Sequence, residues 1–340
     1  MFGLMPHISM DLSNFSEVNN LTKTTETILI TGCSGQDGRL LIDHLSILDL
    51  NVIGTTRSLT KLNALTKLYR NRRNVKIVQL NLENFSDTEL FISSYKPDTV
   101  FHLAAQSSVG LSYADALVTE RSILDVTYNL ITAMRHNRSA KFFNFCSSEC
   151  FGECPSDGAN ENTNFMPVSP YANAKISAAL LVETFIRQNN LNATNLFLFN
   201  HESQFRKATF VTAKIIDTAL EIKNNKAKKL VLGNLDIYRD WCWADEMMAF
   251  LTKIRNSQLP ERLVLGSGTT MLLRDFVDII FNSLELDTCK FVITDQKYLR
   301  STDIKYSLSN PSLATNEFNW KPTLIGPGVV MQLLEQRVRS

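Results

Sequence analysis

Short, continuously apolar segments alternate with helix-like stretches over the first two hundred residues of the chain. The strand-like segments are residues 27–30, 51–55, 75–80, 99–103, 141–145 and 195–199. Helical patterns fall between them, around residues 86–95, 116–136 and 171–189. Apolar strands that alternate with helices are typical of a parallel sheet covered on both faces. We therefore predict an α/β fold with a doubly wound parallel sheet.

A glycine-spaced turn follows the first predicted strand. Gly32, Gly35 and Gly38 stand three residues apart, and a helical pattern with leucines on one side opens directly behind them. Strand, glycine turn and helix together let backbone amides and a helix amino end meet a pyrophosphate. The spacing differs from the G-x-G-x-x-G of most dehydrogenases. The alternative is a glycine-rich turn without a ligand.

The second predicted strand ends without an acidic residue. A carboxylate at this place would accept hydrogen bonds from a ribose diol and repel a phosphate. Arg57 stands there instead, and a guanidinium can make charge-assisted bonds to a 2′-phosphate. The sequence thus favours NADP over NAD, while a solvated surface arginine is the alternative.

Tyr171 and Lys175 stand four residues apart in a helical stretch, so both side chains project from one face. An ammonium beside the phenol favours the phenolate, and we expect Tyr171 to accept a proton near neutral pH rather than near its usual pKa of about 10. Ser147 and Glu149 follow the strand at 141–145. Tyrosine and lysine also occur at this spacing by chance. The pair therefore indicates a catalytic site only in combination with the dinucleotide motif upstream.

Polar or glycine-containing segments stand just after four predicted strands. They are Gly32, residues 104–107, residues 147–149 and residues 200–203. The carboxyl ends of parallel strands meet at one edge of a sheet, which is where ligands bind in such folds. We expect these segments to form one site.

These motifs resemble the extended short-chain dehydrogenases/reductases, and within them the GDP-mannose 4,6-dehydratase family. The resemblance runs from about Thr27 to about Pro322. Its more specific segments are residues 199–203, 210–212, 232–236 with 239–241, and 319–322. It implies a Rossmann-type fold with a smaller C-terminal lobe that binds a sugar nucleotide.

The resemblance also implies a role for each catalytic residue. Tyr171, helped by Lys175, would take the proton of the sugar hydroxyl at carbon 4 while hydride passes to NADP. Glu149 would remove the proton at carbon 5, and Ser147, where the family usually has threonine, would hydrogen-bond the carbon 4 oxygen. Water would leave from carbon 6. An ordinary cap of the following turn is the alternative for Glu149.

Ligand-binding positions follow from the same resemblance. The implied cofactor site is Gly32, Ser34, Gly35, Gln36, Asp37, Gly38, Arg57, Ser58, Asn81, Leu82, Leu103, Ala104, Ala105, Ser107, Tyr171, Lys175, His201 and Arg206. The implied substrate site is Ser107, Asn200, Val211, Lys214, Gly233, Arg239 and Arg300. Each basic residue in these sets could instead be a solvated charge.

Several departures from the family pattern leave the substrate open. Residues 204–205 replace a proline and an arginine, Ala213 replaces a basic residue, and residues 242–247 differ throughout. Asn81, Val118 and Ser58 also differ from the usual residues. A related nucleotide sugar could be the substrate. A 4-keto-reductase or epimerase of the same fold, and a non-catalytic NADP-binding relative, remain alternatives.

The composition is that of a protein without a polyanion partner. The 340 residues carry 35 Lys and Arg against 34 Asp and Glu, which gives no electrostatic case for nucleic acid or a membrane surface. No apolar stretch approaches the roughly 20 residues that span a bilayer. Cys146, Cys150 and Cys154 lack metal-ligand spacing, so we expect reduced thiols, no metal and a cytoplasmic location.

We predict three parts of the chain. Residues 1–26 form a flexible extension, and residues 27–203 form the NADP-binding Rossmann domain, to which 236–260 returns. Residues 204–235 and 261–340 form the sugar-nucleotide lobe. The resemblance implies a homodimer or homotetramer formed through helices beside the Tyr-Lys segment.

Overall fold

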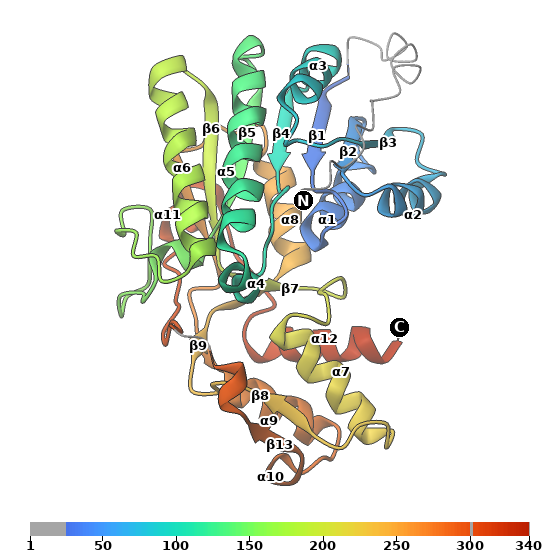
Figure 1. Cartoon of the computed structure of the whole chain (residues 1–340), viewed down its shortest axis with the longest axis vertical. Helices are drawn as coiled ribbons and strands as arrows, with labels where there is room; N and C mark the ends of the chain where they lie inside the picture. The colour runs from blue at the N-terminus through green and yellow to red at the C-terminus, as the bar shows by residue number, and fades with distance from the viewer. Residues whose placement is uncertain (1–24, 300–301, 340) are drawn as a thin grey trace, which may run out of the picture.

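The computed structural model describes residues 25–299 and 302–339 (Figure 1). Its centre is a seven-stranded parallel sheet in the order β11-β6-β5-β4-β1-β2-β3. The strands are β1 (Thr27–Thr31), β2 (Asn51–Thr56), β3 (Val75–Gln79), β4 (Thr99–His102), β5 (Lys141–Ser147), β6 (Asn192–Leu198) and β11 (Arg262–Leu265). The predicted fold class is confirmed.

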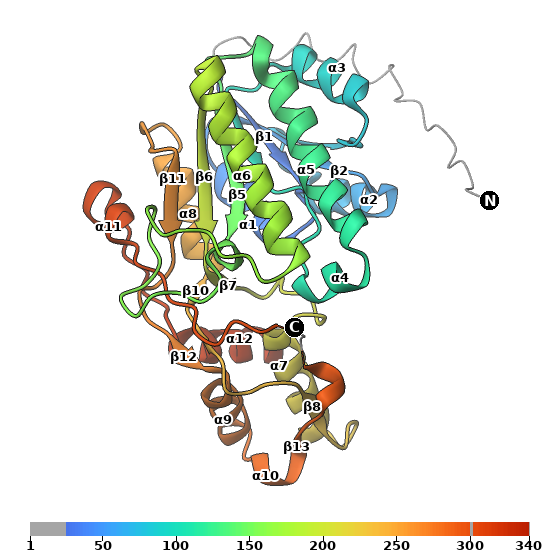
Figure 2. The same ribbon diagram turned by 60° about the vertical axis from the view of Figure 1, so that its left-hand side comes forward.

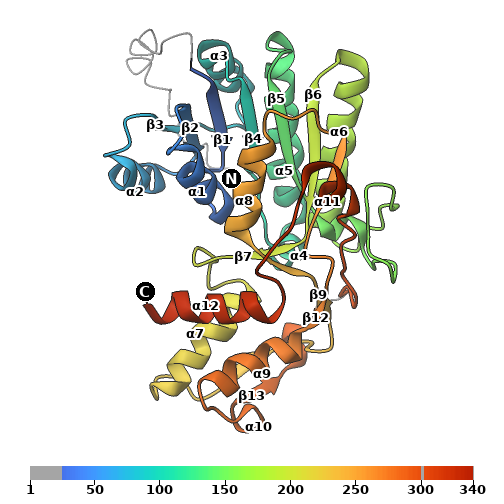
Figure 3. The same ribbon diagram turned by 180° about the vertical axis from the view of Figure 1, so that it is seen from behind.

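Helices cover both faces of this sheet. They are α1 (Gln36–Leu45), α2 (Leu59–Tyr69), α3 (Phe85–Tyr95), α4 (Val109–Ala114), α5 (Ala116–Ala133), α6 (Pro170–Asn189) and α8 (Ala244–Ile254). Figure 3 shows α1 and α8 on one face, and Figure 2 shows α5 and α6 on the other. Side chains of β1 alternate between the two cores: Ile28 and Ile30 pack with α1 and α8, and Leu29 packs with α3, α5 and α6.

Helix α6 carries the predicted tyrosine and lysine, and local signals fix where it starts. Ser169 is the N-cap, and its hydroxyl accepts a hydrogen bond from the backbone N–H of Ala172 at 3.1 Å. Pro170 occupies the first turn, where its missing N–H costs nothing. This start places Tyr171 and Lys175 on the buried side of the helix.

A second group of elements lies beyond the carboxyl ends of the sheet (Figures 1 and 2). It contains α7 (Val211–Lys223), α9 (Leu273–Ser283), α12 (Pro327–Arg339) and the parallel pair β8 (Leu230–Leu232) and β13 (Val292–Thr294). These elements share a hydrophobic core built around Phe276, Phe281 and Trp241. Between this group and the sheet, β7 (Asn200–Glu202) pairs in parallel with β10 (Trp241–Trp243).

One predicted boundary is wrong. Strand β11 pairs with β6 and so belongs to the main sheet, although we assigned the chain from residue 261 onward to the second lobe. Its apolar residues are fully buried: Leu263 and Leu265 pack in the core that contains α1 and α8, and Val264 packs with Phe151 and Phe197. Trp320 also belongs to the core that contains α1 and α8. Its ring packs on Phe250, and its indole N–H donates to the Gly266 carbonyl at 2.7 Å. The rest of the predicted division stays a prediction, although α8 does pack against α1 as expected.

The predicted extension and the predicted location remain untested. Residues 1–24 of the predicted extension lie outside the described residues, and the cytoplasmic location stays a prediction. Within residues 25–299 and 302–339, no helix has the length and apolar character needed to cross a membrane. The same residues contain no cluster of three or more His, Cys, Asp or Glu side chains that could hold a metal ion.

Candidate active site

A cleft of about 1160 Å³ lies at the carboxyl ends of the sheet strands, facing the second group of elements. Every catalytic, cofactor-binding and substrate-binding residue that the sequence predicts lines it, apart from Arg300, which lies outside the described residues. The residues that line the cleft are widely separated in the sequence, from Gly32 to Asp303. The sequence therefore located the cleft, while the role of each residue stays a prediction.

The floor of the cleft is a close backbone approach between two turns. Gly32 has a φ of +68°, and a Cβ built on it would lie 2.8 Å from the backbone nitrogen of Ala104. Only glycine fits both conditions. The Thr31 hydroxyl accepts hydrogen bonds from the backbone N–H groups of Leu103 and Ala104, each at 3.2 Å. The turn after β1 and the turn after β4 are thus held together.

Helix α1 begins at this floor, and the backbone N–H groups of its first turn have no side-chain cap. Its N-cap is Gly35, which has no side chain to accept a hydrogen bond from the first turn. The N–H groups of that turn therefore lack a side-chain cap. Such donors at a helix amino end fit an anionic pyrophosphate.

Beneath the floor, His102 is buried and neutral. Its Nδ1 lies 2.9 Å from the Thr31 hydroxyl and its Nε2 lies 3.1 Å from the Thr127 hydroxyl. Burial, with a smaller contribution from the Lys175 charge, lowers the pKa of His102 to about 3. The Thr127 hydroxyl donates to the Ile123 carbonyl at 2.6 Å, so it accepts from the Nε2–H of His102, and the Thr31 hydroxyl donates to Nδ1. A neutral ring therefore satisfies both partners.

Asp37 and His201 form an ion pair that joins α1 to β7. His201 Nε2 lies 3.1 Å from Asp37 Oδ2, and His201 Nδ1 lies 2.7 Å from the Phe199 carbonyl oxygen. Both partners are acceptors, so the ring must donate from both nitrogens and carry a positive charge. Although burial opposes both charges, the interaction with His201 lowers the pKa of Asp37 to about 2. Asp37 likewise raises the pKa of His201 above its usual value.

Gln36 and Arg206 strengthen the same junction. The Gln36 side-chain amide donates to the His201 carbonyl at 3.0 Å and accepts from the Ser203 hydroxyl at 2.9 Å. Arg206 Nε donates to the buried carboxylate of Glu202 at 2.7 Å, and its Nη2 also donates to the His201 carbonyl. The cofactor turn and the segment leading to the second group of elements are therefore rigidly connected.

The four predicted catalytic residues come from β5, the short 3-10 helix η3 (Ser148–Phe151) that follows it, and α6. The Ser147 hydroxyl accepts from the backbone N–H of Glu149 at 3.3 Å. Lys175 Nζ donates to the Phe145 carbonyl at 2.7 Å. The lysine is thereby fixed to the strand that carries Ser147.

The pKa of Tyr171 is shifted opposite to the expectation from spacing. Burial raises the pKa of the phenol, hydrogen bonding to Ser147 opposes the rise, and the nearby Glu149 adds to it. Burial also lowers the pKa of Lys175. The sequence spacing showed that phenol and ammonium share a face, but it could not show how deeply the face is buried.

Two predicted substrate residues are engaged within the protein. Lys214 Nζ donates to the Val231 carbonyl at 2.6 Å and lies 4.5 Å from the centre of the Tyr298 ring. Arg239 Nη1 donates to the Ile304 carbonyl at 2.7 Å, and Nη2 lies 3.3 Å from Asp303. Lys214 thus contacts Tyr298, and Arg239 holds Asp303 and Ile304 against the cleft.

Other lining residues were missed. They include Lys61, Lys207, Lys297, Tyr298 and Asp303. A lysine in the first turn of the helix after β2 is a signal that sequence inspection could have used for Lys61. Tyr298 gives no such signal, because its position depends on contact with Gly233, whose added Cβ would lie 2.4 Å from the Tyr298 carbonyl oxygen.

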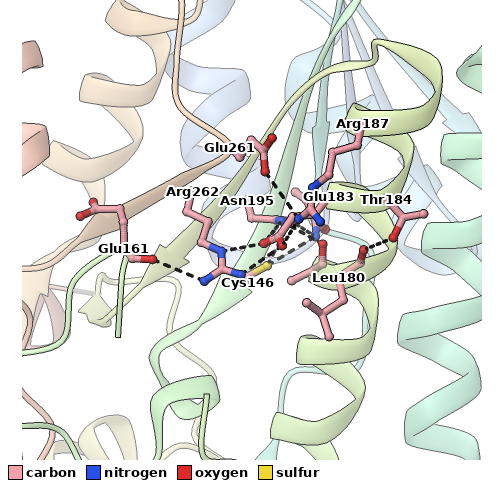
Figure 4. Close-up of polar contacts among 11 residues, drawn as sticks. Cys146, Glu161, Leu180, Glu183, Thr184, Arg187, Asn195, Glu261 and Arg262 are labelled. Atoms are coloured by element: carbon pink, nitrogen blue, oxygen red, sulfur yellow. Dashed lines mark hydrogen bonds and ion pairs between the residues drawn. The ribbon is translucent and has the colours of Figure 1, made fainter. Parts of the chain in front are cut away.

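A buried charge network fixes α6 behind the cleft (Figure 4). The Glu183 side chain is 2% exposed and accepts two hydrogen bonds from Arg262 of β11, at 2.7 and 3.0 Å. Arg187 lies 3.1 Å from the same carboxylate. Asn195 of β6 donates to the Ala179 carbonyl of α6 at 3.0 Å and accepts from Asn144 of β5 at 2.8 Å. Helix α6 is thereby connected to the strands that bear the rest of the site.

The chain is similar to known dehydratases along most of its length. The sequence model of a family described as GDP-mannose 4,6 dehydratase matches residues 29–330. The GDP-mannose 4,6 dehydratase of Cricetulus griseus is 31% identical over 343 residues, which cover 93% of this chain and 92% of the relative.

Solved structures share the fold at lower identity. The dTDP-glucose 4,6-dehydratase of Bacillus anthracis, solved with NAD, matches with a TM-score of 0.80 and 17% identity, covering 93% of this chain and 97% of that one. RMD from Pseudomonas aeruginosa, complexed with NADPH, matches with a TM-score of 0.77 and 19% identity, covering 93% and 100%. The fold and the Tyr-Lys cleft define an extended short-chain dehydrogenase/reductase. Within that class, the chain belongs to the GDP-mannose 4,6-dehydratase family.

The Asp37–His201 pair predicts a pH-dependent change. Asp37 is the largest cause that raises the His201 pKa, while burial and Arg206 lower it. In Asp37→Asn, the His201 pKa should therefore fall below its usual value of about 6.5. Titration of the His201 ring protons by NMR measures this shift. A His201 pKa that stays raised in the variant would contradict the assigned cause.

The same pair sets a pH window for stability. The Asp37 contribution is present above pH 3.8 and is lost as the pH falls through about 2. The His201 contribution is present below about pH 6.5 and is lost as the pH rises through its raised folded-state pKa. The wild-type protein should therefore lose this stabilisation at both extremes, and Asp37→Asn should flatten the profile of melting temperature against pH.

The Glu183 network predicts a large difference between two neighbouring glutamates. Glu183→Gln removes the charged partner of Arg262 in a buried setting and should destabilise the fold by about 2–4 kcal/mol. Glu261→Gln is the matched control, because Glu261 is 46% exposed and lies 3.8 Å from Arg187, so its loss should cost below about 0.5 kcal/mol. Urea unfolding followed by circular dichroism measures both. Equal midpoints for the two variants would show that the network does not stabilise α6.

Proposed function

We propose that the protein is an NADP-dependent nucleotide-sugar 4,6-dehydratase that converts GDP-mannose to GDP-4-keto-6-deoxymannose. The observation that carries this proposal is the presence of Glu149 in the same cleft as Ser147, Tyr171 and Lys175. Epimerases and keto-reductases of this fold need the hydroxyl, phenol and ammonium but no base at carbon 5. Membership of the GDP-mannose 4,6-dehydratase family supports the choice of substrate.

The cleft fits a nicotinamide dinucleotide. The uncapped first turn of α1 supplies backbone donors for a pyrophosphate, and Gly32 and Gly35 leave room for its close approach. NAD and NADPH are bound by the two solved proteins of the same fold. The absence of a carboxylate after β2 supports NADP, with Arg57, Ser58, Asn81 and Leu82 beside the adenosine half. When bound, the oxidised cofactor supplies a positively charged ring that accepts the hydride from carbon 4 and later returns it to carbon 6.

Tyr171 acts on the carbon 4 hydroxyl. Its phenolate accepts the hydroxyl proton as the carbonyl forms, and the Ser147 hydroxyl donates a hydrogen bond to the same oxygen. Because burial raises the pKa of Tyr171, the phenolate needs nearby positive charge, which Lys175 supplies from the same face of α6. Lys175 is oriented for this by its bond to the Phe145 carbonyl.

Glu149 acts at carbon 5. The new ketone at carbon 4 acidifies the carbon 5 hydrogen, and the Glu149 carboxylate removes it. The carbon 6 hydroxyl then takes a proton from Glu149 and leaves as water, which forms a double bond between carbons 5 and 6. Once hydride has been returned to carbon 6, carbon 5 would gain a proton from solvent, and Tyr171 would release to solvent the proton that it took from the carbon 4 hydroxyl. The sum is the loss of one water, so the enzyme is a hydro-lyase.

The sugar nucleotide occupies the part of the cleft formed by the second group of elements. Asn200, Val211, Lys214, Gly233 and Arg239 line this part and would contact the diphosphate, ribose and base. Lys214 and Arg239 are already oriented by carbonyl oxygens, which lowers the entropy lost when they bind an anion. We propose that the chain works as two lobes that meet at this cleft, with the lobe boundary corrected for β11.

We also propose a homodimer or homotetramer in the cytoplasm. Exposed apolar side chains lie on the two helices beside the site: Leu117, Val118 and Tyr128 on α5 and Leu180 on α6. Figure 2 shows these helices side by side on one face of the sheet. Sedimentation velocity should show a dimer or a larger species. A monomer at micromolar concentration would contradict the proposed assembly.

The dehydratase reaction predicts a mass change with an isotopic label. GDP-mannose incubated with the protein and catalytic NADP in deuterated water should lose one water and gain deuterium at carbon 5, as measured by mass spectrometry. Glu149→Gln should reduce kcat by about 10²–10⁴ and leave cofactor binding unchanged.

Other outcomes of this experiment have defined meanings. Net consumption of NADPH without loss of water would identify a reductase, and an isomer of unchanged mass an epimerase. Unchanged GDP-mannose, followed by dehydration of a UDP-, CDP- or dTDP-hexose, would move the proposal to another nucleotide sugar. Full activity of Glu149→Gln on the true substrate would refute the role of this base.

A further inference from the structure

Four charged side chains of the cleft lie near the turns that follow β2 and β3 or interact with a residue there. Arg57 follows β2, Lys61 lies in the first turn of α2, Glu83 follows β3, and Lys207 lies between β7 and α7. All four line the same cleft. Three come from the sheet side and Lys207 comes from the segment that leads to the second core.

The two residues expected from the sequence to bind a 2′-phosphate are already engaged. Arg57 Nη1 lies 3.2 Å from Glu83 Oε1, so the positive charge of Arg57 is balanced by a carboxylate. The Ser58 hydroxyl is the N-cap of α2 and accepts from the backbone N–H of Lys61 at 3.4 Å. Arg57 and Glu83 together contribute no net charge to this group of side chains.

Lys61 and Lys207 supply the unbalanced positive charge. Across residues 25–299 and 302–339, no carboxylate lies within ion-pair distance of either ammonium. Burial lowers the pKa of Lys61, and the charges of Lys207 and Arg57 lower it further, as expected for ammonium groups that share one space. An anion placed between them would relieve this repulsion.

We propose that Lys61 and Lys207 form the subsite for the 2′-phosphate of NADP. A phosphate monoester carries a charge of about −1.5 to −2 near pH 7, which matches two lysines once Arg57 and Glu83 cancel. The 2′-hydroxyl of NAD has no charge for them to neutralise. This inference rests on the proposed function in its choice of cofactor, and it moves the specificity from Arg57 to two residues that the sequence did not single out.

The position of Lys207 adds a second consequence. The neighbouring Arg206 is bonded to the Glu202 carboxylate and to the His201 carbonyl, so the start of this segment is fixed to the cofactor turn. A phosphate held by Lys61 and Lys207 would join α2 to the β7–α7 segment. Binding of NADP, unlike binding of NAD, would therefore connect the sheet to the second group of elements.

Two small probes test the subsite without sugar nucleotide or turnover. Isothermal titration should show that the wild-type protein binds 2′,5′-ADP more tightly than 5′-AMP, which lacks the 2′-phosphate. Lys61→Gln should weaken 2′,5′-ADP binding by about tenfold, and Lys61→Gln with Lys207→Gln by about a hundredfold. Binding of 5′-AMP should change by less than about twofold. Lys67→Gln is the matched control, because Lys67 is an exposed lysine of the same helix outside the cleft, and it should leave both affinities unchanged.

The possible failures are distinguishable. Equal loss of both probes in the lysine variants would assign the lysines to the 5′-phosphate or the pyrophosphate and overturn the proposal. Retained preference for 2′,5′-ADP in the double variant would also overturn it, while NADP would remain the cofactor. A wild-type protein without preference would remove both the subsite and the choice of NADP. Dehydration of GDP-mannose is tested by the mass-spectrometric experiment described above, so the proposed reaction and the proposed subsite can fail independently. Thermal melting of each variant without ligand checks that the fold is intact.

Discussion

The close approach of two backbone turns at Gly32 and Ala104 is the constraint on which the site depends. The missing Cβ of Gly32 allows contact, and the Thr31 hydroxyl holds the two backbone N–H groups of Leu103 and Ala104 in place. Because the turns follow neighbouring parallel strands, this contact forms the floor of the cleft. The N-terminus of α1, which has no side-chain cap, begins at this floor. The buried neutral His102 supports Thr31 from below. The shape of this floor is therefore fixed by the folded edge of the sheet.

The sequence predicted the sheet and the site edge well because both depend on local patterns. The central strands β1, β4, β5 and β6 are buried on both faces, and the polar segments after parallel strands meet at one edge of the sheet. Strand β11 was missed because it is only four residues long, lies at the sheet edge and pairs with β6, which precedes it by more than sixty residues. Helix α2 was missed because only Leu65 and Tyr69 are buried, which leaves a weak apolar stripe. The direction of the Tyr171 pKa shift could not be predicted, since spacing gives orientation but not burial.

Most charges around the cleft already have partners inside the protein. The carboxylate of Asp37 is balanced by His201, that of Glu202 by Arg206, and that of Asp303 by Arg239. Some departures from the family pattern fit this internal pairing. Asp245 pairs with His44 of α1 at 2.9 Å, and Phe205 lies under the guanidinium of Arg39 at 3.7 Å. These substitutions alter how the first lobe is held together, while Ser147, Glu149, Tyr171 and Lys175 still line the cleft.

The ion pair between Glu183 and Arg262 also constrains the order in which the chain can fold. Glu183 belongs to the helix that carries Tyr171 and Lys175, yet its partner is made almost eighty residues later, after α7 and β8 of the second core have been synthesised. Until Arg262 emerges from the ribosome, β11 is absent from the edge of the sheet beside β6. The Glu183 carboxylate, which the native structure buries, must then stay hydrated. A nascent chain ending before β11 should therefore hold α6 loosely. Docking of β11, a contact of high sequence separation, then becomes a late and slow step that fixes the position of α6.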